Sequence, residues 1–268
     1  MVADRWTQAV RAQLGLGRLL PLGGPADGAW IAESAATGVL RRAGAAASPG
    51  LRLGGLRITL ADPAAAARPA VPAPPSGSPP GPLRVTAEFA APADEPLPAV
   101  AERLRSALWS AAERELGLVV GAVDLRVTAL LEGATDEPEG TAGAPGTAET
   151  GRSDRGGRAV EANDDGEEPA PSHAAPSRSA PSDTPSRAAL SVPGVARIAP
   201  VLGAPPPPAP GDVRHVQIQI AVSAGRRPLD VALAVREAVT AAEQGPVTVS
   251  VLVTAVAAPP ESAAPDRG

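Results

Sequence analysis

The chain has 268 residues, and its 24 basic side chains, all of them arginine, stand against 29 acidic ones for a net charge of -5. This length allows about two domains, and because Tyr is absent and Phe occurs once, any core has to be built from Ala, Val, Leu and Ile. The acidic balance disfavours nucleic-acid binding, which depends on neutralising phosphates, and the absence of Cys excludes disulfides, thiolate catalysis and cysteine-based zinc sites.

Residues 1–27 are predicted to form an N-terminal helical arm. Arg5 and Arg11 interrupt its apolar residues, so we expect no secretory signal. Trp6 and Val10 fall on one side of the predicted helix, a stripe that suits a partner groove or a membrane surface. Packing of this short stripe on the chain's own first module is the simpler interpretation.

Residues 28–132 are predicted to form a first α/β module. A helix is expected from Trp30 to Arg42. Alternating apolar and polar residues from Leu83 to Phe89 predict a strand. Apolar residues spaced by three and four from Leu97 to Leu116 predict an amphipathic helix, and alternation from Val123 to Leu131 predicts a closing strand.

Residues 133–187 are predicted to be a disordered linker. Up to Arg187 the only large aliphatic side chain is Val160, and the rest is Gly, Ala, Pro, Ser, Thr and charged residues, with an acidic cluster between Glu161 and Glu168. Such a composition buries too little apolar surface to offset the entropy lost on ordering.

Residues 188–258 are predicted to form a second, truncated α/β module that repeats the order of elements of the first. Residues 259–268 are expected to be a disordered tail. A strand is predicted over Val216–Val222, a helix from Pro228 to Ala242, and a strand over Val247–Val253. The expected fold class is α+β, with two related small modules that each pack an amphipathic helix on a small sheet. We expect the two copies to dock on one another or on a partner through uncovered faces or sheet edges.

Candidate chemistry is sparse. His173 lies in the predicted linker, and His215 begins a strand with no evident catalytic partner, so a surface position is favoured over a general base. No metal-ligand spacing is present, and we predict no catalytic, cofactor or metal residues. Arg226 and Arg227, just before the second helix, are the best candidates for an anion contact, with a solvated turn as the alternative.

Both modules carry a short motif at a Pro-Gly turn. Its residues are Ile31, Ala35 and Ala36 in the first module, and Ala188, Ala189, Val192, Pro193, Gly194 and Val195 in the second. With the order helix, strand, strand, helix, strand, the chain resembles the alkaline shock protein family of bacterial envelope stress proteins. The resemblance covers roughly Gly28 to Glu132 and, truncated, Ala188 to Ala257. It implies self-association, or docking beneath the membrane through a partner.

The function expected from the sequence is therefore a non-enzymatic scaffold or assembly protein in the cytoplasm, acting by self-association or by binding an envelope-associated protein. The alternative is a regulatory protein that binds a small molecule between the two modules. The longest apolar stretch, Val247 to Ala258, is too short to span a bilayer, so no transmembrane segment is expected.

Overall fold

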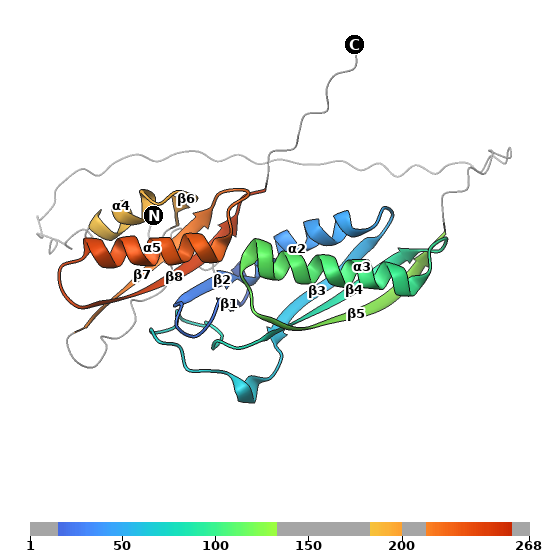
Figure 1. Cartoon of the computed structure of the whole chain (residues 1–268), viewed down its shortest axis with the longest axis horizontal. Coiled ribbons are helices and arrows are strands. Elements are labelled where there is room, and N and C mark those ends of the chain that lie inside the picture. Colours follow the sequence, from blue (N-terminus) through green and yellow to red (C-terminus); the bar gives the residue numbers. More distant parts are fainter. Residues whose placement is uncertain (1–15, 133–182, 200–212, 259–268) are drawn as a thin grey trace, which may run out of the picture. The chain divides into compact units, whose positions relative to one another are not determined.

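The computed structural model describes residues 16–132, 183–199 and 213–258. By their contacts, these described residues belong to one compact unit. The described part of that unit contains a three-stranded and a five-stranded sheet, each covered by helices (Figure 1). The α+β class with two related helix-on-sheet modules is confirmed.

The first half is built on the three-stranded sheet, in the order β3-β4-β5. β3 (Arg52–Leu60) pairs antiparallel with β4 (Leu83–Pro92), and β4 pairs in parallel with β5 (Val120–Leu131). Helices α2 (Glu33–Ala47) and α3 (Leu97–Ser110) pack together on this sheet, and α3 continues into a π-helical turn, η2 (Ala111–Leu116). The parallel pairing requires a crossover, which α3 supplies.

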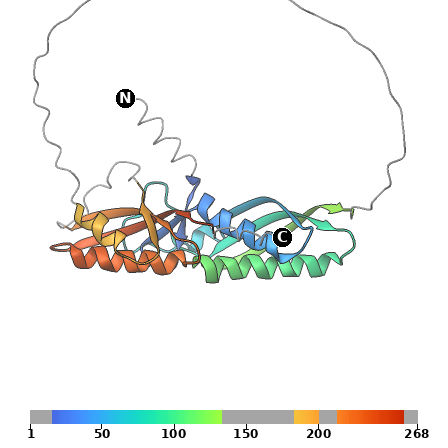
Figure 2. The same ribbon diagram turned by 90° about the horizontal axis from the view of Figure 1, so that it is seen from above.

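The second half repeats this arrangement. β6 (Val195–Ile198) pairs antiparallel with β7 (Arg214–Val222), which pairs in parallel with β8 (Val247–Val256). α5 (Pro228–Ala242) is the crossover helix, and the short α4 (Asp183–Leu190) packs against it. The long helices α3 and α5 each run along one side of their own sheet (Figure 2).

Details of the two sheets support an internal duplication. The β4–β5 register shifts after Phe89, and the β7–β8 register shifts after Ile220. At each shift a threonine hydroxyl donates to the carbonyl of that residue, Thr128 to Phe89 and Thr254 to Ile220, both at 3.1 Å. The buried faces of the helices also correspond, and they are made of Val100, Leu104 and Leu108 in α3 and Val231, Val235 and Val239 in α5.

A hairpin from the start of the described chain completes the second sheet. β1 (Leu19–Leu22) pairs antiparallel with β2 (Ala29–Ala32), and β2 pairs in parallel with β8, giving the order β1-β2-β8-β7-β6. Both hairpin strands are buried throughout. The expected docking of the two copies therefore takes place by strand pairing as well as by packing.

The proline-rich loop between β3 and β4 also reaches the second sheet. It begins with a 3-10 turn, η1 (Pro63–Ala65), and its Val71 packs in a small cluster with Trp30 and Leu252. The indole Nε1 of Trp30 donates to the carbonyl of Ser78 at 3.0 Å. The loop of the first half thus covers the part of the second sheet around Trp30 and Leu252.

Two expectations about the first residues differ from the structure. Leu19–Leu22 form strand β1 although residues 1–27 were expected to be helical, and Trp30 and Ile31 lie in β2 although a helix was expected from Trp30. Both short strands are apolar on both faces, a pattern that periodicity alone does not separate from a buried helix. Strand pairing with β8, a contact distant in sequence, decides the outcome.

The predicted linker, 133–187, and the predicted tail, 259–268, fall mostly outside the described residues. Within the linker range, α4 begins at Asp183. The other predicted strands and helices are confirmed to within a few residues.

Candidate functional site

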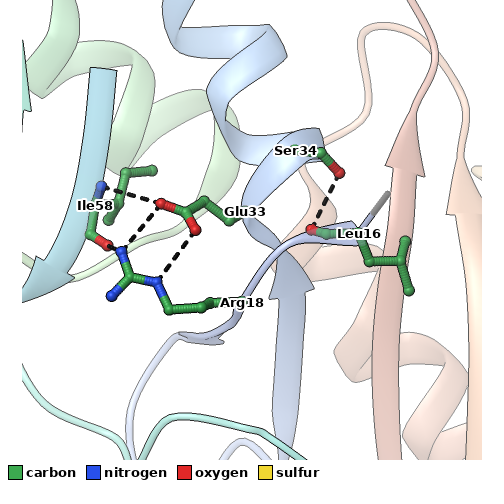
Figure 3. Close-up of polar contacts among 5 residues, drawn as sticks. All are labelled: Leu16, Arg18, Glu33, Ser34 and Ile58. Atoms are coloured by element: carbon green, nitrogen blue, oxygen red, sulfur yellow. Dashed lines mark hydrogen bonds and ion pairs between the residues drawn. The ribbon is translucent and has the colours of Figure 1, made fainter. Parts of the chain in front are cut away.

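Arg18, just before β1, joins the start of the hairpin to α2 and β3 (Figure 3). Its Nε and Nη2 donate to the two carboxylate oxygens of Glu33, each at 3.2 Å, and Nη2 also donates to the carbonyl of Ile58 at 2.8 Å. Burial alone raises the pKa of Glu33, but hydrogen bonds from Arg18 and from the Ile58 N–H outweigh it, so the pKa lies below 4.5. Glu33 in the first turn of α2 is therefore ionised at neutral pH and holds β3 and the hairpin together.

A second close approach joins η2 to α5. Gly117 ends η2 with φ +90°, and its carbonyl accepts from the N–H of Gly23 at 3.1 Å. A Cβ on Gly117 would lie 2.4 Å from Cβ of Leu229, so no larger residue fits between these elements. The end of η2 is thereby held beside the start of α5.

Beside this contact lies a cleft of about 270 Å³, called here the arginine cleft. It is lined by residues of both halves, and these are Val39, Arg42, Arg114, Glu115, Gly225, Arg226, Arg227, Val256 and Ala257. Among the described residues that line it, four are arginines and one, Glu115, is acidic. The cleft exists only when α2 and η2 of the first half meet the β7–α5 loop of the second.

Arg227 is held in place by the protein itself. Its Nη1 donates to Oδ1 of Asp230 at 2.8 Å, and its Nη2 donates to the carbonyl of Glu113 in η2 at 3.0 Å. Its Nε is buried without a hydrogen-bond partner among the described residues. Arg227 is therefore a structural bridge between the halves that retains one unused donor.

The other three arginines of the cleft have fewer interactions with the described part of the protein. Within the described part of the chain, Arg42, Arg114 and Arg226 are exposed and form no ion pair or side-chain hydrogen bond. Glu115 likewise forms no ion pair with them there. The cleft therefore presents excess positive charge on a chain whose net charge is -5.

The sequence singled out Arg226 and Arg227, and the structure brings both to the arginine cleft. Arg42 and Arg114 were missed because exposed arginines on amphipathic helices are ordinary in a sequence. No local signal marks them, since only the docking of the two halves brings them near Arg226. Trp6 and Val10, the predicted partner contacts, lie outside the described residues.

His215 lies in β7, and its two ring nitrogens face hydroxyls of the neighbouring strand. Nδ1 is 2.8 Å from Oγ1 of Thr248 and Nε2 is 3.0 Å from Oγ of Ser250. Burial lowers the pKa of His215 below 6.5, which keeps the ring neutral at neutral pH. The residue is half-buried rather than fully exposed, and these contacts make it a cross-strand link.

The outer edge of β5 is a second feature of functional interest. Among the described residues β5 pairs only with β4, and Val127 and Leu130 on it are 41% and 55% exposed. On the solvent face of this sheet Asp124 pairs with Arg84, and Arg126 pairs with Glu88. An unpaired strand of this kind presents free backbone N–H and C=O groups to another chain.

Two further classes of site are not found in the described residues. Residues 16–132, 183–199 and 213–258 hold no group of three or more His, Cys, Asp or Glu side chains placed to bind a metal ion. No helix within those ranges has the length and apolar character needed to cross a bilayer.

Comparison of the chain with protein-family models, with curated proteins and with solved structures found no match.

Proposed function

We propose that this protein is a non-enzymatic assembly protein that associates with a second copy of itself through the edge of β5. The observation that carries the proposal is the contrast between the two equivalent edges. The outer edge of β8 is covered by β2, whereas that of β5 has no partner strand in the described chain. The last strand of the second half, β8, thus already pairs with an added strand, and the equivalent strand of the first half, β5, leaves the same edge open among the described residues.

A two-fold axis at Leu125 provides a specific register for the added strand. Pairing across such an axis is necessarily antiparallel, and it places Asp124 of each copy opposite Arg126 of the other. Both side chains lie on the solvent face, where they already pair with Arg84 and Glu88. The joined sheet would carry a row of alternating charges, Arg84, Asp124, Arg126 and Glu88, across the two copies.

The opposite face of the strand fits the same register. This face of β5 carries Val123, Leu125 and Val127, which pair with Val85, Ala87 and Phe89 of β4. The three β4 side chains are buried against the helices. Across the axis Leu125 would meet its own copy, and Val123 would meet Val127. The partly exposed side chain of Val127 would then be covered, which favours association.

The test uses two charge variants whose effects cancel when they are mixed. Arg126→Asp places Asp opposite Asp, and Asp124→Arg places Arg opposite Arg, so each variant alone should be monomeric. Mixed in equal amounts, they should form a heterodimer because every opposed pair is again of opposite sign. Analytical ultracentrifugation measures the oligomeric state.

The matched control is Arg57→Asp, which changes the charge of an exposed residue on β3, the far strand of the same sheet. It should associate as the unmodified protein does. A strict monomer of the unmodified protein at high concentration would contradict the proposal, as would Arg126→Asp and Arg57→Asp having equal effects.

The resemblance to envelope stress proteins suggests where such an assembly would act. We extend the proposal to a cytoplasmic location, with docking at the inner face of the membrane through an envelope-associated protein. Co-purification of such a protein with the dimer, and its loss with Arg126→Asp, is the expected result. Partner recovery unchanged by Arg126→Asp would separate docking from self-association.

A further inference from the structure

From the geometry of the arginine cleft we infer a binding site for a small polyanion, of the class of phosphate-bearing metabolites, at the junction of the two halves. Arg42 comes from α2, Arg114 from η2, and Arg226 from the loop between β7 and α5. These elements are far apart in the sequence and converge on one space of about 270 Å³. The inference goes beyond the proposed self-association and does not depend on it.

The charge balance of the cleft indicates an anion. Arg227 is neutralised by Asp230, but Arg42, Arg114 and Arg226 have no acidic partner within the described residues. Of the lining residues that the structure describes, Glu115 alone is acidic. A ligand with two or more negative charges would relieve the repulsion among these guanidinium groups and gain charge-assisted hydrogen bonds.

The hydrogen-bonding chemistry favours phosphate oxygens. Guanidinium groups present planar pairs of N–H donors that match phosphate geometry. Arg227 adds a buried Nε without a partner in the described chain, held beside the cleft by its contacts with Asp230 and Glu113. Its fixed position costs little further entropy when a ligand is bound.

The size of the cleft and the net charge of the protein favour a small ligand. The volume of the cleft is slightly below the range of about 300–1,000 Å³ that is typical of sites for drug-sized molecules. A net charge of -5 repels long polyanions such as nucleic acids. A compact phosphate-bearing group meets both restrictions.

Pyrophosphate is the probe for the test, titrated into the full-length protein by isothermal calorimetry. We expect saturable binding, and a melting temperature that rises with pyrophosphate concentration because the ligand bridges both halves of the folded state. Arg226→Ala and Arg114→Ala should each weaken binding by about tenfold to a hundredfold, the range for a lost hydrogen bond to a charged group. Both residues are exposed, so the variants should keep the fold, which circular dichroism checks.

Two further variants separate a built site from general charge effects. Glu115→Gln removes the carboxylate that repels an anion and should tighten binding several-fold. Arg57→Ala removes an exposed arginine outside the cleft and should leave the affinity unchanged. The absence of saturable binding at millimolar pyrophosphate would overturn the inference, as would equal losses with Arg57→Ala and Arg226→Ala.

Discussion

At the residue scale, two arginines show how similar side chains serve different purposes. Arg18 is satisfied by Glu33 and by the carbonyl of Ile58, and it holds the hairpin to β3. Arg226 has no ion-pair partner in the described chain and faces the arginine cleft. A guanidinium bound to carboxylate and carbonyl oxygens stabilises the fold, whereas an unpaired one is available to a ligand.

Glu33→Gln tests the structural role of the Arg18 contact. The variant should lower the free energy of unfolding by about 1 kcal/mol at neutral pH, a value reduced by the partial exposure of Arg18. Because the folded-state pKa of Glu33 is lowered, its contribution is present above pH 4.5 and is lost as the pH falls through that lowered pKa. Urea unfolding of both proteins over a pH series measures the difference.

The control for this prediction is Glu102→Gln. Glu102 pairs with Arg105 on the exposed face of α3, so its loss should change stability by less than about 0.5 kcal/mol. A stability difference between Glu33→Gln and the unmodified protein that stays constant from neutral pH down to the most acidic pH at which both remain folded would show that the carboxylate charge is not the cause.

At the element scale, the end of η2 is one point of close approach between the two halves. Gly117 has a left-handed backbone conformation and lies directly against Leu229 of α5. Gly245, before β8, has a similar φ of +103° but has nothing within 4 Å of the position of a Cβ. The two glycines therefore share the backbone requirement and differ in the space around them.

Gly117→Ala and Gly245→Ala form a matched pair. Gly245→Ala should cost about 1–2 kcal/mol, the strain of a left-handed residue with a side chain. Gly117→Ala should cost about 1–3 kcal/mol more, because its methyl group overlaps Leu229 and the halves must move apart. Thermal or urea unfolding measures the stability of both variants. Equal losses of stability would show that Leu229 moves aside without an energetic cost.

At the scale of the whole molecule, the two copies share one continuous core. Buried side chains of α2, β4, α5 and β8 belong to the same hydrophobic cluster. The hairpin β1–β2 adds to the second sheet, and Val71 from the first half packs against Leu252 of β8. The segments on either side of residues 133–182 are thus interlocked rather than independent.

Separate expression of residues 1–132 and 183–268 tests this interlocking. The fragment 183–268 lacks β1 and β2, so the edge of β8 and the side chain of Leu252 lose their cover. We expect neither fragment alone to show a cooperative thermal transition by circular dichroism, and mixing them to restore one. A sharp transition of either fragment near the melting temperature of the intact chain would contradict this.

Elements whose form depends on nearby residues could be predicted from the sequence, and elements whose form depends on distant strands could not. Strand alternation in Val216–Val222 and helical spacing in Leu97–Leu116 report burial by near neighbours, and β7, α3 and η2 form there. Leu19–Leu22 and Ala29–Ala32 carry no such pattern, and their strand form depends on pairing with one another and with β8. Local periodicity was therefore sufficient for the repeated elements and insufficient for the hairpin.

The amino-acid sequence alone determined the α+β class, the duplicated order of elements, and Arg226 and Arg227 as anion candidates. Tertiary structure decided the order β1-β2-β8-β7-β6, the β5 edge that pairs with no other described strand, and the meeting of Arg42 and Arg114 with Arg226. The reason is physical: helix and strand periodicity records which side chains are buried, whereas the choice between equivalent edges and the convergence of exposed charges arise only when distant segments pack.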